Sequence, residues 1–163
     1  MIVREPVAGD AQALARIYNH YVRESIVTFE EVEIDGDEMR QRMRDVAAAG
    51  LPWRVAEEGG RVVGFAFAGK WKARAAYRHS VETTVYVDPA GLGQGIGRRL
   101  YDDLFARLGQ LDVNAVIGGI ALPNDRSVAL HEAMGMVKVA HFKSVGFKFG
   151  RWIDVAYWQL LLK

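Results

Sequence analysis

A glycine-rich turn between a predicted strand and a predicted helix constrains this chain more than any other feature. The segment reads VETTVYVDPAGLGQGIG from Val81 to Gly97, with glycines at 91, 93, 95 and 97. Glycine adopts positive φ and has no Cβ, so several backbone N–H groups can converge on an anion at the N-terminus of the following helix. The turn therefore suits a nucleotide-bearing cofactor, although a turn that only caps a helix has the same composition.

Two familiar phosphate-binding loops do not fit this spacing. A Walker A loop requires Lys and then Ser or Thr after its last glycine, whereas Gly97 precedes Arg98 and Arg99. A dinucleotide fingerprint requires G-x-G-x-x-G, and its last position falls on Ile96 or on Arg98 in the two available registers. The segment is therefore neither an NTPase loop nor a dinucleotide fingerprint.

Composition narrows the classes of protein further. A chain of 163 residues has the length of one domain with a sizeable core, so we expect a single domain over residues 1–163. The 21 Lys and Arg residues and 20 Asp and Glu residues nearly balance, which offers no global field for nucleic acid or an anionic membrane. The absence of cysteine excludes a thiol nucleophile and thiolate metal ligands, and we expect no metal site. Without a signal segment or an apolar run of about 18 residues, we expect a cytoplasmic protein.

The hydrophobic pattern predicts an α/β fold with a mixed sheet and helices on both faces. Strands are expected at 2–3, 53–56, 62–68, 80–87 and 113–121, and in two runs between 136 and 162 that break at 148–151. Helices are expected after Asp10 and over 35–50, 97–108 and 124–134, with Asp10 and Asp35 as N-caps. The Gly59-Gly60 pair predicts an antiparallel hairpin, whereas the later helical crossover implies parallel neighbours.

Glu82 is a carboxylate in the middle of a predicted strand. Because side chains alternate along a strand, Glu82 points away from the face that holds Val81, Thr83, Val85 and Val87. Burying a carboxylate without a partner is costly, so Glu82 needs either a function or a hydrogen-bonded partner. A solvated or salt-bridged glutamate is the alternative, and the nearness of the glycine-rich turn favours a function.

Five segments, taken in order, resemble one family. They are NHYVRESIVTF at 19–29, GKWKARAAY at 69–77, VETTVYV at 81–87, LPNDRSVALHEAMG at 122–135 and GFKFGRWIDVAYWQL at 146–160. With the glycine-rich turn, they resemble GNAT-superfamily N-acetyltransferases, and within these the phosphinothricin and methionine sulfoximine acetyltransferase group. Five ordered blocks are far more specific than any one of them. The resemblance implies a single-domain GNAT fold, with a mixed, mostly antiparallel sheet splayed between two central parallel strands.

The resemblance also implies a site for acetyl-CoA, as a co-substrate, where those parallel strands diverge. It places the pantetheine arm along the backbone of residues 85–87 and the diphosphate on the amides of residues 92–97. One position departs from the family, because Leu92 stands where Arg or Gln is usual, so a side-chain contact is missing. The predicted cofactor-binding residues are Val85, Tyr86, Val87, Leu92, Gly93, Gln94, Gly95, Ile96, Gly97, Asn124 and Ser127.

Attack of an amine on a thioester requires the amine to lose a proton, and the departing thiolate benefits from one. The resemblance assigns the first task to Glu82, acting through a water. His131 stands seven residues after Asn124, where this group has histidine and many superfamily members have tyrosine. We expect His131 to protonate the thiolate or to assist deprotonation, with a packed helix residue as the alternative.

The acceptor site is predicted around a basic, aromatic loop. Residues that match the pocket of the resembled enzymes are Phe29, Lys72, Arg74, Tyr77 and Tyr86. Such a loop suits a small acceptor that bears a carboxylate and another acidic or polar group, although a solvated loop has the same composition. The predicted function is N-acetylation of the α-amine of phosphinothricin, methionine sulfoximine or methionine sulfone. Without cysteine or an activated serine, we expect direct transfer in a ternary complex.

Other functions stay open at this point. The acceptor can instead be a polyamine, an aminoglycoside or a protein N-terminus, or the chain can be a non-catalytic acetyl-CoA-binding module. The basic loop argues against polycationic acceptors, and intact Glu82 and His131 argue against a non-catalytic module. Apolar residues also crowd the last predicted strand more than one buried face needs, which together with the family indicates a homodimer. They are Val155, Tyr157, Trp158, Leu160 and Leu161.

Overall fold

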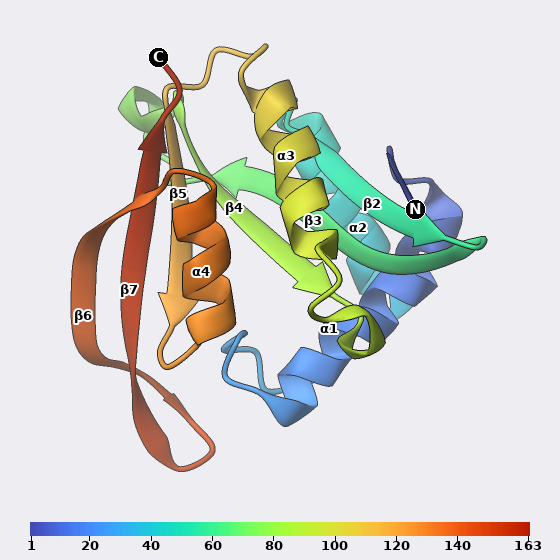
Figure 1. Ribbon diagram of the computed structural model, residues 1–163, viewed down its shortest axis with the longest axis horizontal. Helices are drawn as coiled ribbons and strands as arrows, with labels where there is room; N and C mark the ends of the chain where they lie inside the picture. Colours follow the sequence, from blue (N-terminus) through green and yellow to red (C-terminus); the bar gives the residue numbers. More distant parts are fainter.

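Seven strands form one sheet in the computed structural model of residues 1–163, in the order β1-β2-β3-β4-β5-β7-β6 (Figure 1). All neighbours are antiparallel except β4 and β5, so the predicted mixed, mostly antiparallel sheet is confirmed. The strands are β1 (Ile2–Arg4), β2 (Trp53–Glu58), β3 (Arg61–Lys70), β4 (Ser80–Val87), β5 (Ala115–Ala121), β6 (Val137–Lys148) and β7 (Arg151–Leu161).

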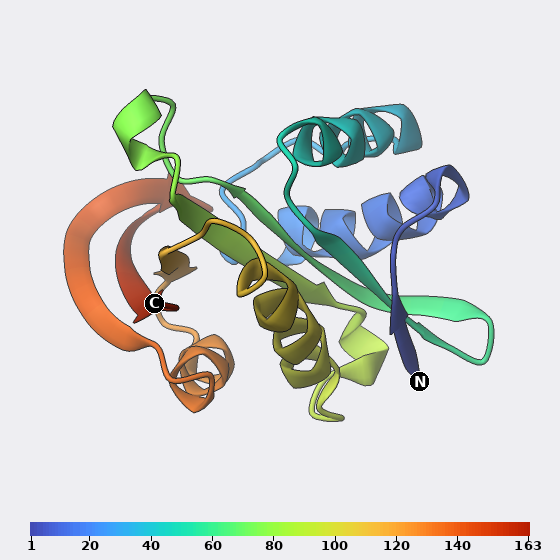
Figure 2. The same cartoon turned by 90° about the horizontal axis from the view of Figure 1, so that it is seen from above.

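Four helices cover the two faces of the sheet. Figure 2 shows α1 (Ala11–Glu24) and α2 (Gly36–Ala48) on one face, and α3 (Ile96–Leu108) and α4 (Asp125–Ala133) on the other. Each face has its own apolar core. Leu14, Ile17 and Phe65 are buried on the first face, and Leu100, Leu104 and Val116 on the second. The alternation of side chains along β2, β3 and β4 supplies both cores from the same strands.

The predicted N-caps behave differently. Asp35 caps α2, since its carboxylate accepts a hydrogen bond of 2.8 Å from the backbone N–H of Glu38. The prediction that Asp10 caps α1 is wrong. The carboxylate of Asp10 accepts two hydrogen bonds of 2.9 Å from Arg4 and one of 2.8 Å from the N–H of Val7. A bidentate guanidinium bond is stronger than a bond to a helix amide, and it draws the carboxylate away from the helix.

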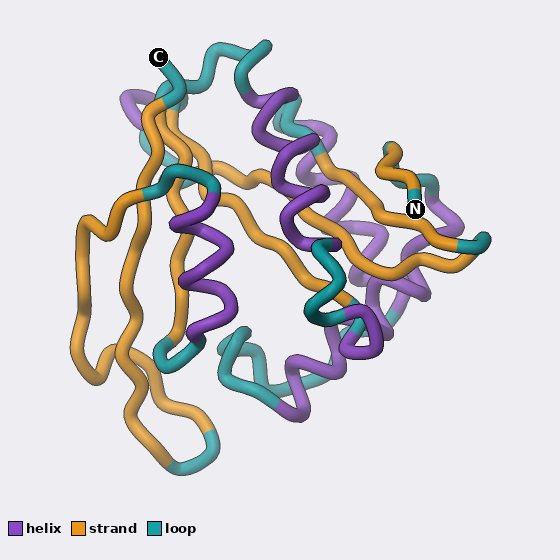
Figure 3. Tube along the Cα trace, in the orientation of Figure 1, coloured by secondary structure: helices purple, strands orange, loops and turns teal.

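The site is positioned by the divergence of β4 from β5. The two strands pair only at Ser80↔Ala115, Val81↔Val116 and Glu82↔Ile117. Beyond these positions the edge of β4 that faces β5 has no partner strand, as the resemblance implied. Figure 3 shows that the loop after β4, the loop before α4 and the connection between α1 and α2 gather at this open end.

A long hairpin of β6 and β7 closes the other side of the opening (Figure 1). Its tip is tied to the connection between α1 and α2, because the Lys148 amine donates hydrogen bonds to the carbonyls of Ser25 and Thr28 at 2.8 and 2.7 Å. Lys148 is only 2% exposed, and this burial lowers its pKa. The hairpin and the connection therefore form one continuous wall.

Candidate functional site

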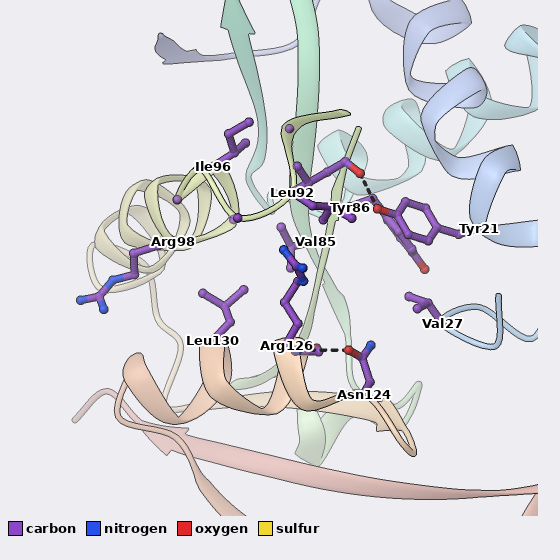
Figure 4. A pocket seen from close by; sticks show the side chains of 16 residues that line it. Tyr21, Val27, Val85, Tyr86, Leu92, Ile96, Arg98, Asn124, Arg126 and Leu130 are labelled. Carbon is purple, nitrogen blue, oxygen red and sulfur yellow. Dashed lines mark hydrogen bonds between the residues drawn. The ribbon is translucent and has the colours of Figure 1, made fainter. Parts of the chain in front are cut away.

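A cleft of about 400 Å³ opens between the glycine-rich loop, β4 and the first turns of α4 (Figure 4). We call it the donor cleft. Every predicted cofactor-binding residue lines it except Gln94, whose side chain bonds the carbonyl of Ala90 at 3.4 Å. Sequence reasoning missed six lining residues, and all of them except Arg98 belong to segments that had been singled out. The six are Tyr21, Val27, Gly91, Arg98, Arg126 and Leu130.

The backbone of the glycine-rich loop is shaped for an anion. Gly93 and Gly95 have φ values of +81° and +78°, in the left-handed region that glycine adopts most readily. Gly95 is the N-cap of α3, and no side chain caps this helix. The N–H groups of the first turn of α3 thus lack intrahelical partners, and the helix dipole adds positive potential there. The residues present fit the diphosphate of coenzyme A.

Two further contacts order the walls of the donor cleft. The side chain of Asn124 accepts a hydrogen bond of 3.1 Å from the N–H of Ser127 and so caps α4. The carbonyl of Val87 accepts a hydrogen bond from the hydroxyl of Tyr21. The first turn of α4 and the end of β4 are thereby held by contacts within the protein.

A second cavity, of about 520 Å³, adjoins the donor cleft. We call it the acceptor cavity. Tyr86 and Val27 line both spaces, so the two are neighbours. Its walls are mostly apolar and aromatic, and Glu82 is its one carboxylate. The lining residues are Val27, Thr28, Phe29, Glu82, Tyr86, Gly119, Ala121, Phe142, Val145, Val155 and Tyr157.

Glu82 is the last β4 residue that pairs with β5, and its carboxylate lies against Gly119. A Cβ on Gly119 would lie 3.3 Å from Oε2 of Glu82 and 2.8 Å from the ring of Tyr157. Burial raises the pKa of Glu82 above its ordinary value, and the charge of Lys72 opposes the change. A carboxylate with a raised pKa is better matched to taking a proton from an ammonium group near neutral pH.

His131 lies at the same level of the sheet as Glu82 but on the opposite face. A Cβ on Gly118 would lie 2.6 Å from its imidazole, so the ring packs directly on β5. His131 is 3% exposed and lines neither space. Burial lowers its pKa, while the bond to Ser127 opposes the change. Nδ1 donates to the carbonyl of Ser127 at 2.7 Å, which leaves the lone pair of Nε2 facing the hydroxyl of Tyr101 at 3.4 Å.

The structure brings only some of the predicted acceptor residues together. Phe29 and Tyr86 line the acceptor cavity, whereas Lys72, Arg74 and Tyr77 do not. Arg74 and Tyr77 are exposed in the loop before β4. Lys72 lies nearer to the acceptor cavity than these two residues, because its charge acts on the carboxylate of Glu82. Its amine sits 4.9 Å from the ring centre of Trp71. A direct role for these three in acceptor binding stays a prediction.

The structure contains neither a cluster of metal-ligating side chains nor a helix that could span a membrane. No three His, Cys, Asp or Glu side chains come close enough to hold a metal ion together. None of the helices combines the length and the apolarity needed to cross a bilayer.

The splayed sheet, the anion-binding loop at the end of β4 and the carboxylate at the divergence define an acetyltransferase architecture. The family profile described as "Acetyltransferase (GNAT) domain" matches residues 3–157. The chain belongs to this family and is an acetyl-CoA-dependent N-acetyltransferase. The predicted fold and the predicted enzyme class are thereby confirmed.

Three known proteins show which branch of the family the chain resembles. Phosphinothricin N-acetyltransferase of Alcaligenes faecalis is 44% identical over 92% of this chain and 77% of its own. The L-methionine sulfoximine/L-methionine sulfone acetyltransferase of Salmonella typhimurium is 34% identical over 99% and 95%. The crystal structure of a phosphinothricin acetyltransferase from Sinorhizobium meliloti in complex with AcCoA superposes with a TM-score of 0.95, at 35% identity over 98% and 87% of the two chains. These matches confirm the predicted resemblance.

Proposed function

We propose that this enzyme acetylates the α-amine of a small amino acid analogue, with phosphinothricin, methionine sulfoximine and methionine sulfone as candidate acceptors. The names of the Alcaligenes and Salmonella relatives support this class of acceptor. One observation carries the proposal, namely the single carboxylate of Glu82 in an acceptor cavity that adjoins the donor cleft. Acetyl-CoA, as the co-substrate, occupies the donor cleft in this proposal.

The reaction is direct transfer in a ternary complex. The ammonium group of the acceptor first loses one proton to Glu82 through a water. The amine nitrogen then forms a bond to the acetyl carbon while the bond between that carbon and sulfur breaks, and the second proton of the nitrogen passes to the departing thiolate of coenzyme A. Two adjoining spaces allow both substrates to be bound at once, and the chain has no cysteine to hold an acyl intermediate. His131 lines neither space, and its Nε2 faces the hydroxyl of Tyr101 at 3.4 Å, so its proposed assistance in deprotonation is indirect.

The walls of the acceptor cavity favour a compact zwitterion over a polycation. A polyamine or aminoglycoside needs several carboxylates, and Glu82 is the only one that lines the cavity. The charge of Lys72 acts on Glu82, and a cation so placed suits the carboxylate of an amino acid. Lys72, Arg74 and Tyr77 are proposed to meet the acceptor from outside the cavity mouth.

We also propose that the enzyme is a homodimer, on a different basis from the one the sequence suggested. Of the five residues that the sequence suggested, Trp158 is 2% exposed, and Val155 and Tyr157 wall the acceptor cavity, so these three are not free for a partner. Leu160 is half-buried, and only Leu161 is largely exposed, at 58%. The exposed apolar surface lies instead on the β6–β7 hairpin, whose outer strand β6 is an unpaired edge of 12 residues. The residues of this exposed apolar surface are Val137, Val139, Val145, Phe147, Phe149 and Trp152.

The cytoplasmic location of the enzyme stays a prediction.

The decisive experiment measures thiol release from acetyl-CoA with phosphinothricin, methionine sulfone, spermine and a panel of peptides. We expect turnover with the amino acid analogues and a product acetylated on the α-amine, identified by mass spectrometry. Initial rates against both substrates should give intersecting lines, as a ternary complex requires. Turnover with spermine or peptides alone contradicts the acceptor class, and parallel lines contradict direct transfer.

Sedimentation velocity of the wild type and of Trp152→Glu tests the proposed homodimer.

A further inference from the structure

Arg126 extends from the first turn of α4 across the donor cleft toward the glycine-rich loop (Figure 4). A Cβ placed on Gly93 would lie 3.6 Å from Nη1 of Arg126. The guanidinium therefore stands over the backbone that presents its N–H groups to an anion. Two elements that are far apart in the chain converge on one point of the cleft.

The guanidinium of Arg126 forms no hydrogen bond or ion pair within the protein. Arg98 lines the same cleft, but its side chain bonds Asp102 at 2.9 Å and the carbonyl of Ala133 at 3.3 Å. Figure 4 shows its guanidinium turned away from the cleft. The charge of Arg126 is felt inside the cleft, since it opposes the burial that raises the pKa of Tyr21. Arg126 is thus a cation aimed into the cleft without a carboxylate to neutralise it.

The glycine-rich loop itself carries no charged side chain. Leu92 stands at the start of the loop, lines the donor cleft and is 40% exposed. None of the residues from 91 to 97 carries a positive charge. The loop can therefore bind a diphosphate only through its backbone, and two negative charges remain to be matched. A guanidinium, with its planar fork of donors, matches phosphate oxygens in two hydrogen bonds.

We propose that Arg126 binds the diphosphate of acetyl-CoA and supplies from α4 the charged contact that Leu92 cannot make. The inference rests on the proposed role of the donor cleft as the acetyl-CoA site. It makes α4 part of the recognition of the donor, in addition to the cap by Asn124. It also explains how a loop without a side-chain ligand retains a cofactor with a doubly charged linkage.

The test compares the dissociation constants of coenzyme A, dephospho-coenzyme A and pantetheine for the wild type and Arg126→Ala, measured by calorimetry. We expect binding of the first two ligands to weaken about tenfold, because both contain the diphosphate, and pantetheine binding to stay unchanged. The loss should shrink at high salt, since an exposed charge pair is screened. Arg99→Ala is the matched control, because it removes the same charge from a side chain that bonds the carbonyl of Met1 outside the cleft.

A second variant tests whether an arginine at position 92 can replace the contact of Arg126 with the diphosphate. In Arg126→Ala, the added change Leu92→Arg should restore most of the lost affinity for coenzyme A, while Leu92→Arg alone should change the wild type little. Unchanged coenzyme A affinity in Arg126→Ala overturns the inference, as does an equal loss for pantetheine or a failed rescue. If the wild type itself does not bind coenzyme A, the proposed function fails instead. Thermal melting confirms that each variant is folded.

Discussion

The donor cleft and the acceptor cavity meet at the same divergence of β4 from β5, yet they are built in opposite ways. The donor cleft uses the backbone of one continuous loop, residues 91–97, together with the start of α4. The acceptor cavity uses side chains from segments spread over the chain, at 27–29, 82–86, 119–121 and 142–157. The anion-binding loop of the donor cleft is a local structure, whereas the acceptor cavity is a tertiary one throughout.

The two spaces also use glycine for different reasons. Gly93 and Gly95 supply positive φ, so their role is conformational. Gly118 and Gly119 are consecutive in β5 and supply room, one for His131 on the face that α3 and α4 cover and one for Glu82 and Tyr157 on the opposite face. The difference teaches that backbone recognition tolerates a substitution such as Leu92, whereas the acceptor side depends on the volume of individual side chains.

The largest effect should come from Glu82→Gln, which keeps the shape of the acceptor cavity and removes the base. We expect kcat/KM to fall by about 10²–10⁴, the usual contribution of a general base. The affinity for coenzyme A should not change, because Glu82 does not line the donor cleft. Steady-state kinetics and calorimetry measure the two quantities. A variant with near wild-type turnover would remove Glu82 from the mechanism.

Gly119→Ala should damage the acceptor cavity alone. The new Cβ would lie 2.8 Å from the ring of Tyr157, so the ring must move into the cavity. We expect kcat/KM for the acceptor to fall on the order of tenfold or more, because a small misplacement of reacting groups is costly. Gly69→Ala in β3 is the matched control, since its Cβ would meet nothing within 4 Å. Equal kinetics for the two variants would contradict the spatial role of Gly119.

Gly95→Ala should act on the donor cleft alone. Alanine at a φ of +78° costs roughly 1–2 kcal/mol, and the loop would relax away from its anion-binding shape. We expect affinity for coenzyme A to fall by about five- to thirtyfold, while the KM of the acceptor stays the same at saturating donor. Calorimetry measures the affinity for coenzyme A, and two-substrate kinetics measure the KM of the acceptor. A change confined to the acceptor KM would break the division between the two spaces.

The smallest effect concerns pH. Activity requires ionised Glu82, so kcat/KM should fall as the pH drops through its pKa, which burial raises and the charge of Lys72 lowers. Lys72→Met removes the opposing charge, raises the pKa further and moves the acidic limb of the profile to higher pH. The profile of Arg74→Ala serves as the comparison, because no effect of Arg74 on Glu82 is found. A limb that stays in place would show that Lys72 does not act on the base.

The sequence predicted the roles of some residues correctly and those of others wrongly or not at all. The cap by Asp35 and the hairpin turn at Gly59 and Gly60 were predicted from neighbouring residues and are present. The role of Asp10 was mispredicted, because its partner Arg4 lies in β1 and a bidentate, part-buried ion pair outweighs a helix cap. Glu82 was singled out because a lone carboxylate interrupts a β-branched strand, and it does line the acceptor cavity, while its role as the base stays a prediction. No local pattern indicated Arg126 as a ligand of the cleft.

The sequence by itself determined the strand, loop and helix that make the donor cleft, since glycine conformations and helix starts depend on a few adjacent residues. It also determined the family, through ordered blocks along the chain. Only the tertiary structure decided which side chains wall the acceptor cavity, that His131 and Glu82 stand on opposite faces of the sheet, and that Arg126 reaches the loop. These contacts join residues far apart in the chain, and they depend on strand register and on the docking of α4 and the β6–β7 hairpin.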